Sequence, residues 1–311
     1  MKILVTGGAG FIGSHVVDAY VAQGHDVVVV DDLSTGRKAN LNPAATFYQL
    51  DIRDPELETI FAREKPQIVN HHAAQVDVRR SVADPVFDAG VNVTGSLRLL
   101  ECARRHGVQK VIYISTGGAV YGEPEYLPCD EQHPIRPLAP YGASKHAVEH
   151  YLFLYQHNHN LRYTILRYPN VYGPRQDPHG EAGVVAIFTR QLLQDEQPTI
   201  YGDGLQERDF VYVGDCAQAN VLALTAGENE IYNLASGEGT SINELFARLK
   251  EITRSQQEVA YGPAKAGETY KIYLDATKAG EELGWRQRVS LTEGLAQTVD
   301  HFRRHEQAEA R

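Results

Sequence analysis

The first half of the chain alternates short apolar runs with amphipathic stretches. The run DVVVV at 26–30 is short and β-branched, which is typical of a buried strand in a parallel sheet. Similar runs lie at Lys2–Thr6, Phe47–Leu50, Gln67–His71, Lys110–Ser115 and Arg162–Leu166. Helices are expected between them at Phe11–Gln23, Pro55–Glu64, Asp84–Arg105 and Pro140–His159. Strands that alternate with helices predict βαβ units, and therefore an α/β protein with a doubly wound parallel sheet.

The rhythm changes after about Tyr168, where proline and glycine interrupt the pattern. Helices are expected at Val184–Gln194, Asp215–Ala226, Ile242–Thr253, Thr277–Leu283 and Leu291–Arg303. Short strands are expected at Thr199–Tyr201, Phe210–Val213, Ile231–Leu234 and Lys271–Leu274. We therefore expect one domain over 1–168 and a smaller, interleaved α/β domain over 169–311, with segments near 209–236 returning to the first.

Composition narrows the classes of function. The 311 residues carry a net charge of −10, which disfavours non-specific binding to nucleic acid. The chain has no apolar run of about 18 residues and no N-terminal signal pattern, so we expect neither a membrane span nor secretion. Cys102, Cys129 and Cys216 are odd in number and far apart, which indicates reduced cytoplasmic thiols. The 13 histidines show no metal-binding spacing, and no metal site is predicted.

A glycine-rich turn follows the first expected strand. Gly7, Gly10 and Gly13 permit a tight turn, close approach of a pyrophosphate and packing of helix on strand. The following helix would direct its first amides at the phosphates. Asp31 ends the DVVVV strand and could accept hydrogen bonds from ribose hydroxyls while repelling a 2′-phosphate, which predicts NAD over NADP. Asp51 ends the third strand and would either meet an adenine amino group or cap the next helix.

Tyr141 and Lys145 form a candidate catalytic pair. On a helix they are four residues apart and share a face. A tyrosine is a poor base at its reference pKa of about 10, but a neighbouring ammonium and a nicotinamide cation both favour the phenolate. Ser115 and Thr116 bring hydroxyls to the carboxyl end of a strand, where such sheets bind ligands. Together with the glycine turn, this arrangement favours a catalytic pair over two surface residues.

These motifs resemble the extended short-chain dehydrogenase/reductase family and, within it, the UDP-glucose 4-epimerases. The resemblance covers nearly the whole chain and rests on TGGAGFIGSH (6–15), HHAAQ (71–75), VNVTGSLRLLE (91–101), YISTGGAVYGE (113–123), PYGASK (140–145), LRYPNVYGPRQDP (166–178) and RDFVYVGD (208–215). It implies a Rossmann fold that binds NAD over 1–168, with a substrate-binding domain over 169–311. It also implies a UDP-sugar substrate, and a homodimer through helices near 84–105 and 140–159.

The resemblance assigns further site residues by position. Around NAD it places Gly7, Gly10, Phe11, Ile12, Gly13, Asp31, Asp32, Leu33, Ser34, Thr35, Gly36, Asp51, Ile52, Ala73, Ala74, Gln75, Asn92, Ser115, Tyr141, Lys145 and Tyr168. Around the substrate it places Thr116, Gly117, Asn170, Val184, Tyr201, Arg208 and Lys265. Val184 and Tyr201 would border the uracil. Arg208 and Lys265 would hold the diphosphate, although the family usually has arginine where Lys265 stands and lysine lacks its bidentate fork.

The chain departs from the family in one loop. Four positions before Tyr121 the family usually carries Ser or Thr, whereas this chain carries Gly117. We expect Thr116, the nearest hydroxyl, to replace it; the alternative is that Thr116 only caps the strand end. Gly118 and Ala119 stand where related 4,6-dehydratases carry Asp-Glu, and where sugar-nucleotide decarboxylases carry Glu in the second position. Neither residue can transfer a proton, which argues against both reactions.

The resemblance therefore implies an NAD-dependent 4-epimerase of a UDP-hexose, such as the UDP-glucose/UDP-galactose pair of galactose metabolism. Tyr141 would take the O4 proton while hydride passes from C4 to NAD, and both would return on the other face of the sugar. Several alternatives stay open. Arg175 could meet the carboxylate of UDP-glucuronate, and Ile272 is small enough as a wall residue to admit UDP-N-acetylglucosamine. A net keto-sugar reductase and a non-catalytic NAD-binding scaffold are the others, and the intact Tyr141 and Lys145 speak against the scaffold.

Overall fold

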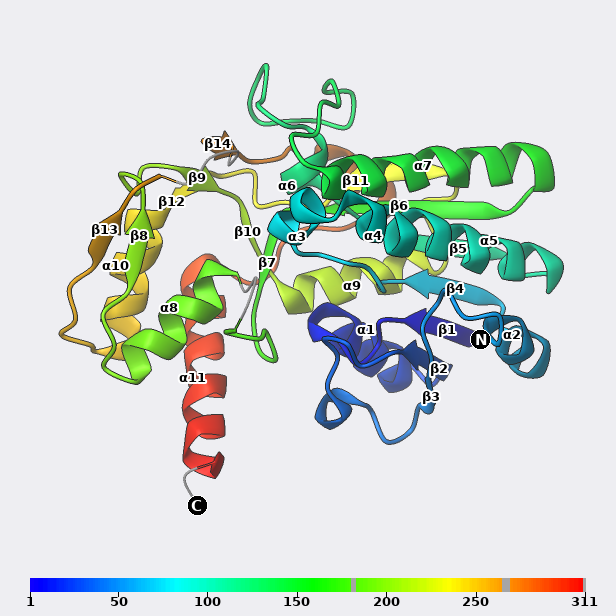
Figure 1. The fold of residues 1–311 in the computed structure, drawn as a ribbon, viewed down its shortest axis with the longest axis horizontal. Coiled ribbons are helices and arrows are strands. Elements are labelled where there is room, and N and C mark those ends of the chain that lie inside the picture. The colour runs from blue at the N-terminus through cyan, green and yellow to red at the C-terminus, as the bar shows by residue number, and fades with distance from the viewer. Residues whose placement is uncertain (180–182, 265–268, 310–311) are drawn as a thin grey trace.

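The computed structural model describes residues 1–179, 183–264 and 269–309. Its centre is one parallel sheet of seven strands in the order β11-β6-β5-β4-β1-β2-β3 (Figure 1). The strands are β1 (Lys2–Thr6), β2 (Asp26–Asp31), β3 (Thr46–Gln49), β4 (Ile68–His71), β5 (Lys110–Thr116), β6 (Arg162–Tyr168) and β11 (Glu230–Asn233). The order reverses between β1 and β4, which is where such sheets bind ligands. The predicted α/β protein with a doubly wound sheet is confirmed.

Helices cover both faces of the sheet. One face carries α1 (Phe11–Ala22) and α9 (Val213–Ala223), and the other carries α2 (Leu57–Glu64), α5 (Ser96–Arg105) and α7 (Pro140–His159). Val27 and Val29 of β2 pack in the first layer, and Val30 packs in the second. Because both faces are buried, the strands are continuous apolar runs instead of alternating ones.

The second half of the chain adds β11 to the edge of the sheet and packs α9 against α1. It also forms a separate group of elements, the small lobe, at the left of Figure 1. The small lobe consists of α8 (Val184–Leu193), β8 (Thr199–Tyr201), β9 (Glu207–Arg208), β12 (Thr240–Ser241), α10 (Ile242–Thr253), β13 (Ala260–Gly262), β14 (Lys271–Ile272) and α11 (Leu291–Glu309). A parallel pair, β7 (Asn170–Tyr172) and β10 (Phe210–Tyr212), lies between it and the sheet (Figure 1).

The helical stretch expected near Asp84–Arg105 is confirmed, but it is not a uniform α-helix. It runs without a break through α4 (Pro85–Ala89), the π-helical turn η2 (Gly90–Gly95) and α5, and a separate short helix, α3 (Val78–Ala83), precedes it. Asp77 caps α3 and Asp84 caps α4 through their side chains. A π turn inserts one extra residue, and such insertions are common at functional sites. A second π turn, η3 (Ala279–Leu283), replaces most of the helix expected at Thr277–Leu283.

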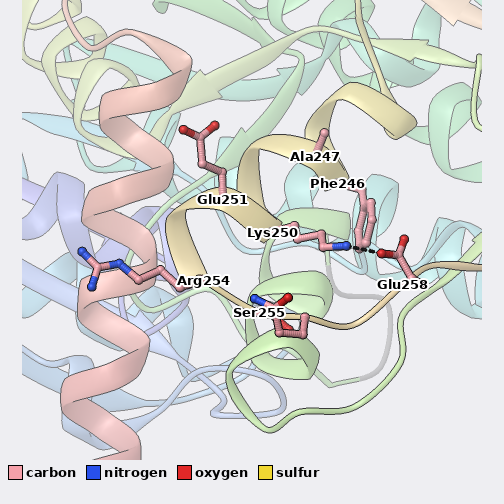
Figure 2. Close-up of a pocket in the computed structure, with 8 residues that line it drawn as sticks. Phe246, Ala247, Lys250, Glu251, Arg254, Ser255 and Glu258 are labelled. Carbon is pink, nitrogen blue, oxygen red and sulfur yellow. Dashed lines mark hydrogen bonds and ion pairs between the residues drawn. The ribbon is translucent and has the colours of Figure 1, made fainter.

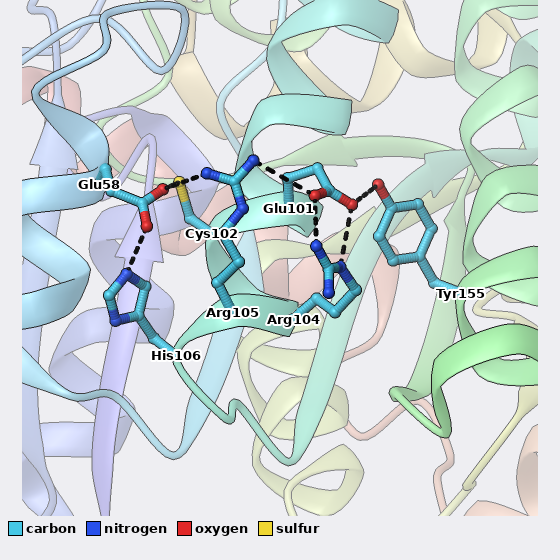
Figure 3. A network of polar contacts seen from close by, with 7 residues as sticks. All are labelled: Glu58, Glu101, Cys102, Arg104, Arg105, His106 and Tyr155. Atoms are coloured by element: carbon cyan, nitrogen blue, oxygen red, sulfur yellow. Dashed lines mark hydrogen bonds and ion pairs between the residues drawn. The ribbon is translucent and has the colours of Figure 1, made fainter.

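A polar network joins α2, α5 and α7 on the α7 side of the sheet (Figure 3). Glu101 accepts hydrogen bonds from Arg104 at 2.9 Å and from the Tyr155 hydroxyl at 2.7 Å. Cys102 donates its thiol to Glu58, and burial followed by that bond raises its pKa to about 12. All three cysteines are free and buried, so the structure gives them packing roles. Among the described residues, no helix is long and apolar enough to cross a membrane.

Candidate active site

The turn between β1 and α1 lies at the carboxyl end of the sheet. Gly7 has a φ of +69°, and a Cβ there would lie 2.7 Å from the backbone nitrogen of Ala73, which follows β4. A Cβ on Gly13 would lie 2.2 Å from the Gly7 carbonyl oxygen, so both positions exclude a side chain. Helix α1 begins after Gly10 without a side-chain cap, which leaves its first amides for an anion. These amides belong to Phe11, Ile12 and Gly13.

Asp31 links this turn to the segment after β2. Its Oδ2 accepts the Ala9 N–H at 2.9 Å, and its Oδ1 accepts the Leu33 N–H at 2.9 Å. Burial raises the pKa of the Asp31 carboxyl, and the two backbone amides oppose that effect. Asp32 accepts both the N–H and the hydroxyl of Ser34, which shapes the next turn. The residues predicted to surround the ribose therefore form one bonded unit with the glycine turn.

Asn92, on the π turn, fixes the loop after β4. Its Oδ1 accepts the Gln75 N–H at 2.8 Å, and its Nδ2 donates to the Gln75 carbonyl at 2.9 Å. The Gln75 side chain donates to Asp88, which is 1% exposed. Asn92 Nδ2 also lies 3.2 Å from Ser144 Oγ on α7. Asn92 thus shapes the 73–75 turn, where the cofactor is expected, and joins it to α7.

Asp51 pairs with a neighbour instead of capping a helix. Arg53 Nη2 donates to its Oδ2 at 2.6 Å, and this bond lowers the pKa of the Asp51 carboxyl. Helix α2 begins at Leu57, six residues later, so the capping alternative is wrong. The next residue, Ile52, is buried, and its Cδ1 lies 2.8 Å from where a Cβ on Gly95 of η2 would be. Glycine is therefore suited to the close approach of η2 to the loop after β3.

Tyr141 and Lys145 lie at the start of α7. Lys145 is 4% exposed, and its Nζ lies 4.4 Å from the centroid of the Tyr113 ring on β5. Neither Lys145 Nζ nor the Tyr141 hydroxyl makes a hydrogen bond to another residue within the described parts of the chain. Burial lowers the pKa of Lys145 to about 7, opposed by the charges of Glu149 and Asp88.

The same surroundings disfavour the phenolate form of Tyr141. Burial, followed by the charge of Asp88, raises the pKa of Tyr141 above its ordinary value. The described residues alone therefore do not prepare the phenolate that a general base requires. A second positive charge beside the ring, as the oxidised nicotinamide of NAD would supply, fits the uncommitted hydroxyl and ammonium that the structure shows here.

Ser115 points into the protein interior. Its Oγ donates to Glu149 at 2.6 Å, and Arg167 Nη2 donates to the same carboxylate at 2.6 Å. Arg167 also donates to the Tyr121 hydroxyl at 2.8 Å. Burial alone would raise the pKa of Glu149, but hydrogen bonds from His146, Arg167 and Ser115 lower it to about 2. The resemblance assigns Ser115 to the cofactor, yet its side chain is committed to this buried ion pair.

Thr116, at the end of β5, and Asn170, at the start of β7, both lie near Gly118. A Cβ on Gly118 would lie 3.9 Å from Thr116 Oγ1 and 3.9 Å from Asn170 Oδ1, and it would meet no closer atom. The short helix α6 (Gly117–Val120) begins after Thr116, whose hydroxyl makes no capping bond. The structure thus brings together two residues predicted to contact the sugar.

The residues expected at the nucleotide end come from the small lobe. Arg208 on β9 donates to the Glu207 carbonyl at 2.9 Å and pairs in register with Ile272 on β14. Ile272 is 3% exposed. Tyr201 ends β8 and is 44% exposed, and Val184 begins α8. Lys265, expected at the diphosphate, lies outside the described residues.

Two residues considered for the site have partners within the protein. Arg175 Nη2 donates to Asp18 on α1 at 2.7 Å, whereas Nη1 is buried without a hydrogen-bond partner among the described residues. The Asp18 carboxylate already balances the charge of Arg175. Tyr168 is 3% exposed, and its hydroxyl accepts a hydrogen bond from Asn220 Nδ2 on α9. Its ring belongs to the core beneath the predicted nicotinamide region.

A hollow of about 510 Å³ lies elsewhere, at the C-terminal end of α10 (Figure 2). Phe246, Lys250 and Arg254 help to line it, and Lys250 is paired with Glu258 across it. None of the predicted site residues borders this hollow. Over 1–179, 183–264 and 269–309, no group of three or more His, Cys, Asp or Glu residues could hold a metal ion.

Comparison with known proteins places this geometry in a family. Residues 3–235 match the model of the NAD dependent epimerase/dehydratase family. UDP-glucose 4-epimerase of Mycolicibacterium smegmatis is 46% identical, over 99% of this chain and 100% of that protein. Since the match covers most of the chain, this protein belongs to the NAD dependent epimerase/dehydratase family.

Solved structures agree in fold over almost the whole length. A UDP-glucose 4-epimerase from Thermotoga maritima, solved with UDP-glucose, is 51% identical with a TM-score of 0.97, covering 98% of this chain and 100% of that chain. One from Thermus thermophilus, solved with NAD, is 47% identical with a TM-score of 0.94, covering 97% and 99%. These relatives, alike in sequence and in fold over nearly their whole length, are UDP-glucose 4-epimerases.

Proposed function

We propose that the protein is an NAD-dependent UDP-hexose 4-epimerase that interconverts UDP-glucose and UDP-galactose. One observation carries the proposal. Tyr141 and Lys145 share one helix at the sheet's ligand-binding edge, and their polar atoms bond to no other described residue. Both polar atoms are therefore available to a ligand that binds at this edge. The relatives that were solved with UDP-glucose and with NAD support the choice of ligands.

The chain's residues divide the work by position. The amides at the start of α1 would hold the NAD diphosphate, Asp31 would take the adenosine ribose, and Lys145 would bind near the nicotinamide ribose. Bound NAD supplies a reversible hydride acceptor at C4 of the sugar. Tyr141 would remove the O4 proton and return it after the sugar has turned. Arg208 would hold the diphosphate, so the binding energy comes from the part of the substrate that does not react.

Thr116 would donate a hydrogen bond to O4 in place of the missing hydroxyl. Its Oγ1 lies 3.9 Å from where a Cβ on Gly118 would be, as does Asn170 Oδ1. A fixed donor there aligns the proton transfer to Tyr141 and stabilises negative charge that develops on the oxygen. The absent capping bond supports this role, because the hydroxyl stays available to a substrate.

We also propose a homodimer through α3, α4 and α7. These helices pack side by side and expose apolar side chains: Val82 is 62% exposed, Val86 81%, Phe153 53% and Leu154 43%. An unusually exposed apolar set on adjacent helices is typical of an association surface. A second copy of the chain, related by a twofold axis, would cover it. We place the enzyme in the cytoplasm, in keeping with its three free thiols. The proposed reaction belongs to galactose metabolism.

The deciding experiment incubates the purified protein with UDP-glucose, UDP-N-acetylglucosamine and UDP-glucuronate, and resolves the products by NMR. We expect the 4-epimer of UDP-glucose and no net reduction. Nucleotide released by denaturation should be NAD, because Asp31 disfavours a 2′-phosphate. Preferred turnover of another sugar would change the substrate. Bound NAD without turnover of any sugar would favour the scaffold alternative.

A further inference from the structure

Leu274 fills the space over Gly117. A Cβ on Gly117 would lie 2.2 Å from Leu274 Cδ1, and 3.3 Å from both its Cδ2 and its Cγ. Leu274 is fully buried and packs in one apolar cluster with Val120 and Tyr121. Any side chain at position 117 therefore requires Leu274 to move within a packed interior, and such overpacking is costly.

The backbone of Leu274 is held from two directions. Its N–H donates to Asp209 Oδ2 at 3.2 Å, and Asp209 is 1% exposed. Residues on either side are tied to Cys129: the Cys129 N–H donates to the Tyr273 carbonyl at 3.0 Å, and the Asp275 N–H donates to the Cys129 carbonyl at 2.7 Å. These bonds fix the leucine against the loop, so it cannot withdraw as a unit.

The neighbouring glycine has the opposite surroundings. A Cβ on Gly118 would meet nothing closer than 3.9 Å, where the two nearest atoms are polar. Two adjacent glycines thus differ: position 117 is closed by an apolar side chain, and position 118 would hold a Cβ in ordinary van der Waals contact with Thr116 and Asn170. The absence of a hydroxyl-bearing side chain at position 117 is therefore coupled to the packing of Leu274.

We propose that Leu274 is a positioning residue that bars a side-chain hydroxyl from position 117 and leaves Thr116 as the donor of this loop. The role of the Thr116 hydroxyl rests on the proposed function, whereas the packing of Leu274 on Gly117 does not. Asp209, which anchors Leu274, directly follows Arg208. One short segment thus sets both the contact with the loop and the place of the diphosphate residue.

Thermal unfolding tests the packing. The variants are Gly117→Ser, Leu274→Val and their combination, with Gly118→Ser as the matched control. Leu274→Val removes the Cδ atoms but keeps a buried apolar side chain. We expect Gly117→Ser to lower Tm by roughly 3–8 °C and Gly118→Ser by less than about 1 °C. The double variant should unfold close to Leu274→Val alone. Equal Tm values for the two serine variants, or strictly additive losses, would overturn the proposal.

Turnover of UDP-glucose tests the positioning. In a Thr116→Ala background, Gly117→Ser should restore kcat at least about tenfold only when Leu274→Val is also present. Bound NAD, quantified after denaturation, should be equal in all variants compared. Restoration without the Leu274 change, or no restoration with it, counts against the proposal. If Thr116→Ala alone kept normal turnover, the proposed role of Thr116 would fail, while the Tm coupling would still decide the role of Leu274.

Discussion

Two neighbouring turns of α7 each carry a buried charged side chain, but only one of the two has hydrogen-bond partners among the described residues. At Glu149, both carboxylate oxygens are bonded, to Ser115, Arg167 and His146. At Lys145, one turn earlier, the ammonium has only the Tyr113 ring within the described structure. The first arrangement lowers the pKa of Glu149 to about 2, and burial in the second lowers the pKa of Lys145 to about 7.

The difference separates a charged group that stabilises the fold, Glu149, from one that remains available to a ligand, Lys145. A buried charge with a full set of partners stabilises one arrangement of the strands and helices around it. A buried charge without partners costs stability, and it is retained where a ligand completes it. Mutations at the two turns should therefore act on different quantities.

The largest effect is expected at Tyr141. Tyr141→Phe removes the proton acceptor and little else, because its hydroxyl bonds to no described residue. We expect kcat to fall by about 10²–10⁴, with little change in Tm or in bound NAD. Steady-state kinetics with UDP-glucose, beside a melting curve, checks both parts. Near-normal turnover would show that another group is the base.

The second largest effect is expected at Glu149, whose carboxylate is fully hydrogen-bonded. Glu149→Gln leaves Arg167 buried without its counter-charge, and should lower the free energy of unfolding by about 3–5 kcal/mol. Glu101→Gln, in the more exposed network of Figure 3, is the control and should cost less than about 1 kcal/mol. Denaturant titration measures both. Equal losses at the two sites would remove the contrast drawn here.

Thr116→Ala should lower kcat by about 10²–10³, because a preorganised donor to O4 is lost. Thr116→Ser keeps the hydroxyl and should be mild. KM for UDP-glucose should change less than kcat in both variants, since the diphosphate end binds independently. A normal kcat for Thr116→Ala would leave Tyr141 and Lys145 as the sufficient pair.

The smallest effects are in pH dependence: both turns make stability rise with pH, but over different pH ranges. Glu149 has a depressed pKa, so its contribution is present above pH 4.5 and is lost as pH falls towards 2. Lys145 has a lowered pKa, so the unfolded chain binds more protons above pH 7 and stability rises from there towards pH 10.5. Lys145→Met should raise the Tm of the nucleotide-free protein by roughly 3–6 °C at pH 6, and by less at pH 10. A pH-independent gain would contradict the assignment.

Much of this could be read from the sequence, because the signals are local. The glycine turn, the strand before Asp31 and the spacing of Tyr141 and Lys145 each depend on residues close together in the chain. Helix α10 (Ile242–Thr253) was predictable to the residue, since Ser241 caps it and its apolar face repeats regularly.

The rest depends on contacts between distant segments. Leu274 packs on Gly117, although the two residues are 157 positions apart in the sequence, and no local pattern predicts that contact. Arg175 was open to a ligand in the sequence, but it finds Asp18 on α1. The hydroxyl of Ser115 could face either side of its strand, and only the position of Glu149 on α7 decides the side. Such choices are made by tertiary structure.

The π turn at Gly90–Gly95 makes the chain sensitive to the loss of a single residue. Deleting Val91 would let the segment relax into a regular α-helix, which is the commoner geometry. Because the deletion removes the one extra residue of the π turn, the helical segments on either side would keep their register, and Leu99 and Leu100 would stay in the core. The loss would be local: Asn92 would leave its place opposite Gln75, and the loop after β4 would lose the two bonds that shape it. Loss of one residue here is therefore compatible with the fold, and its cost would appear in the loop where the cofactor is expected.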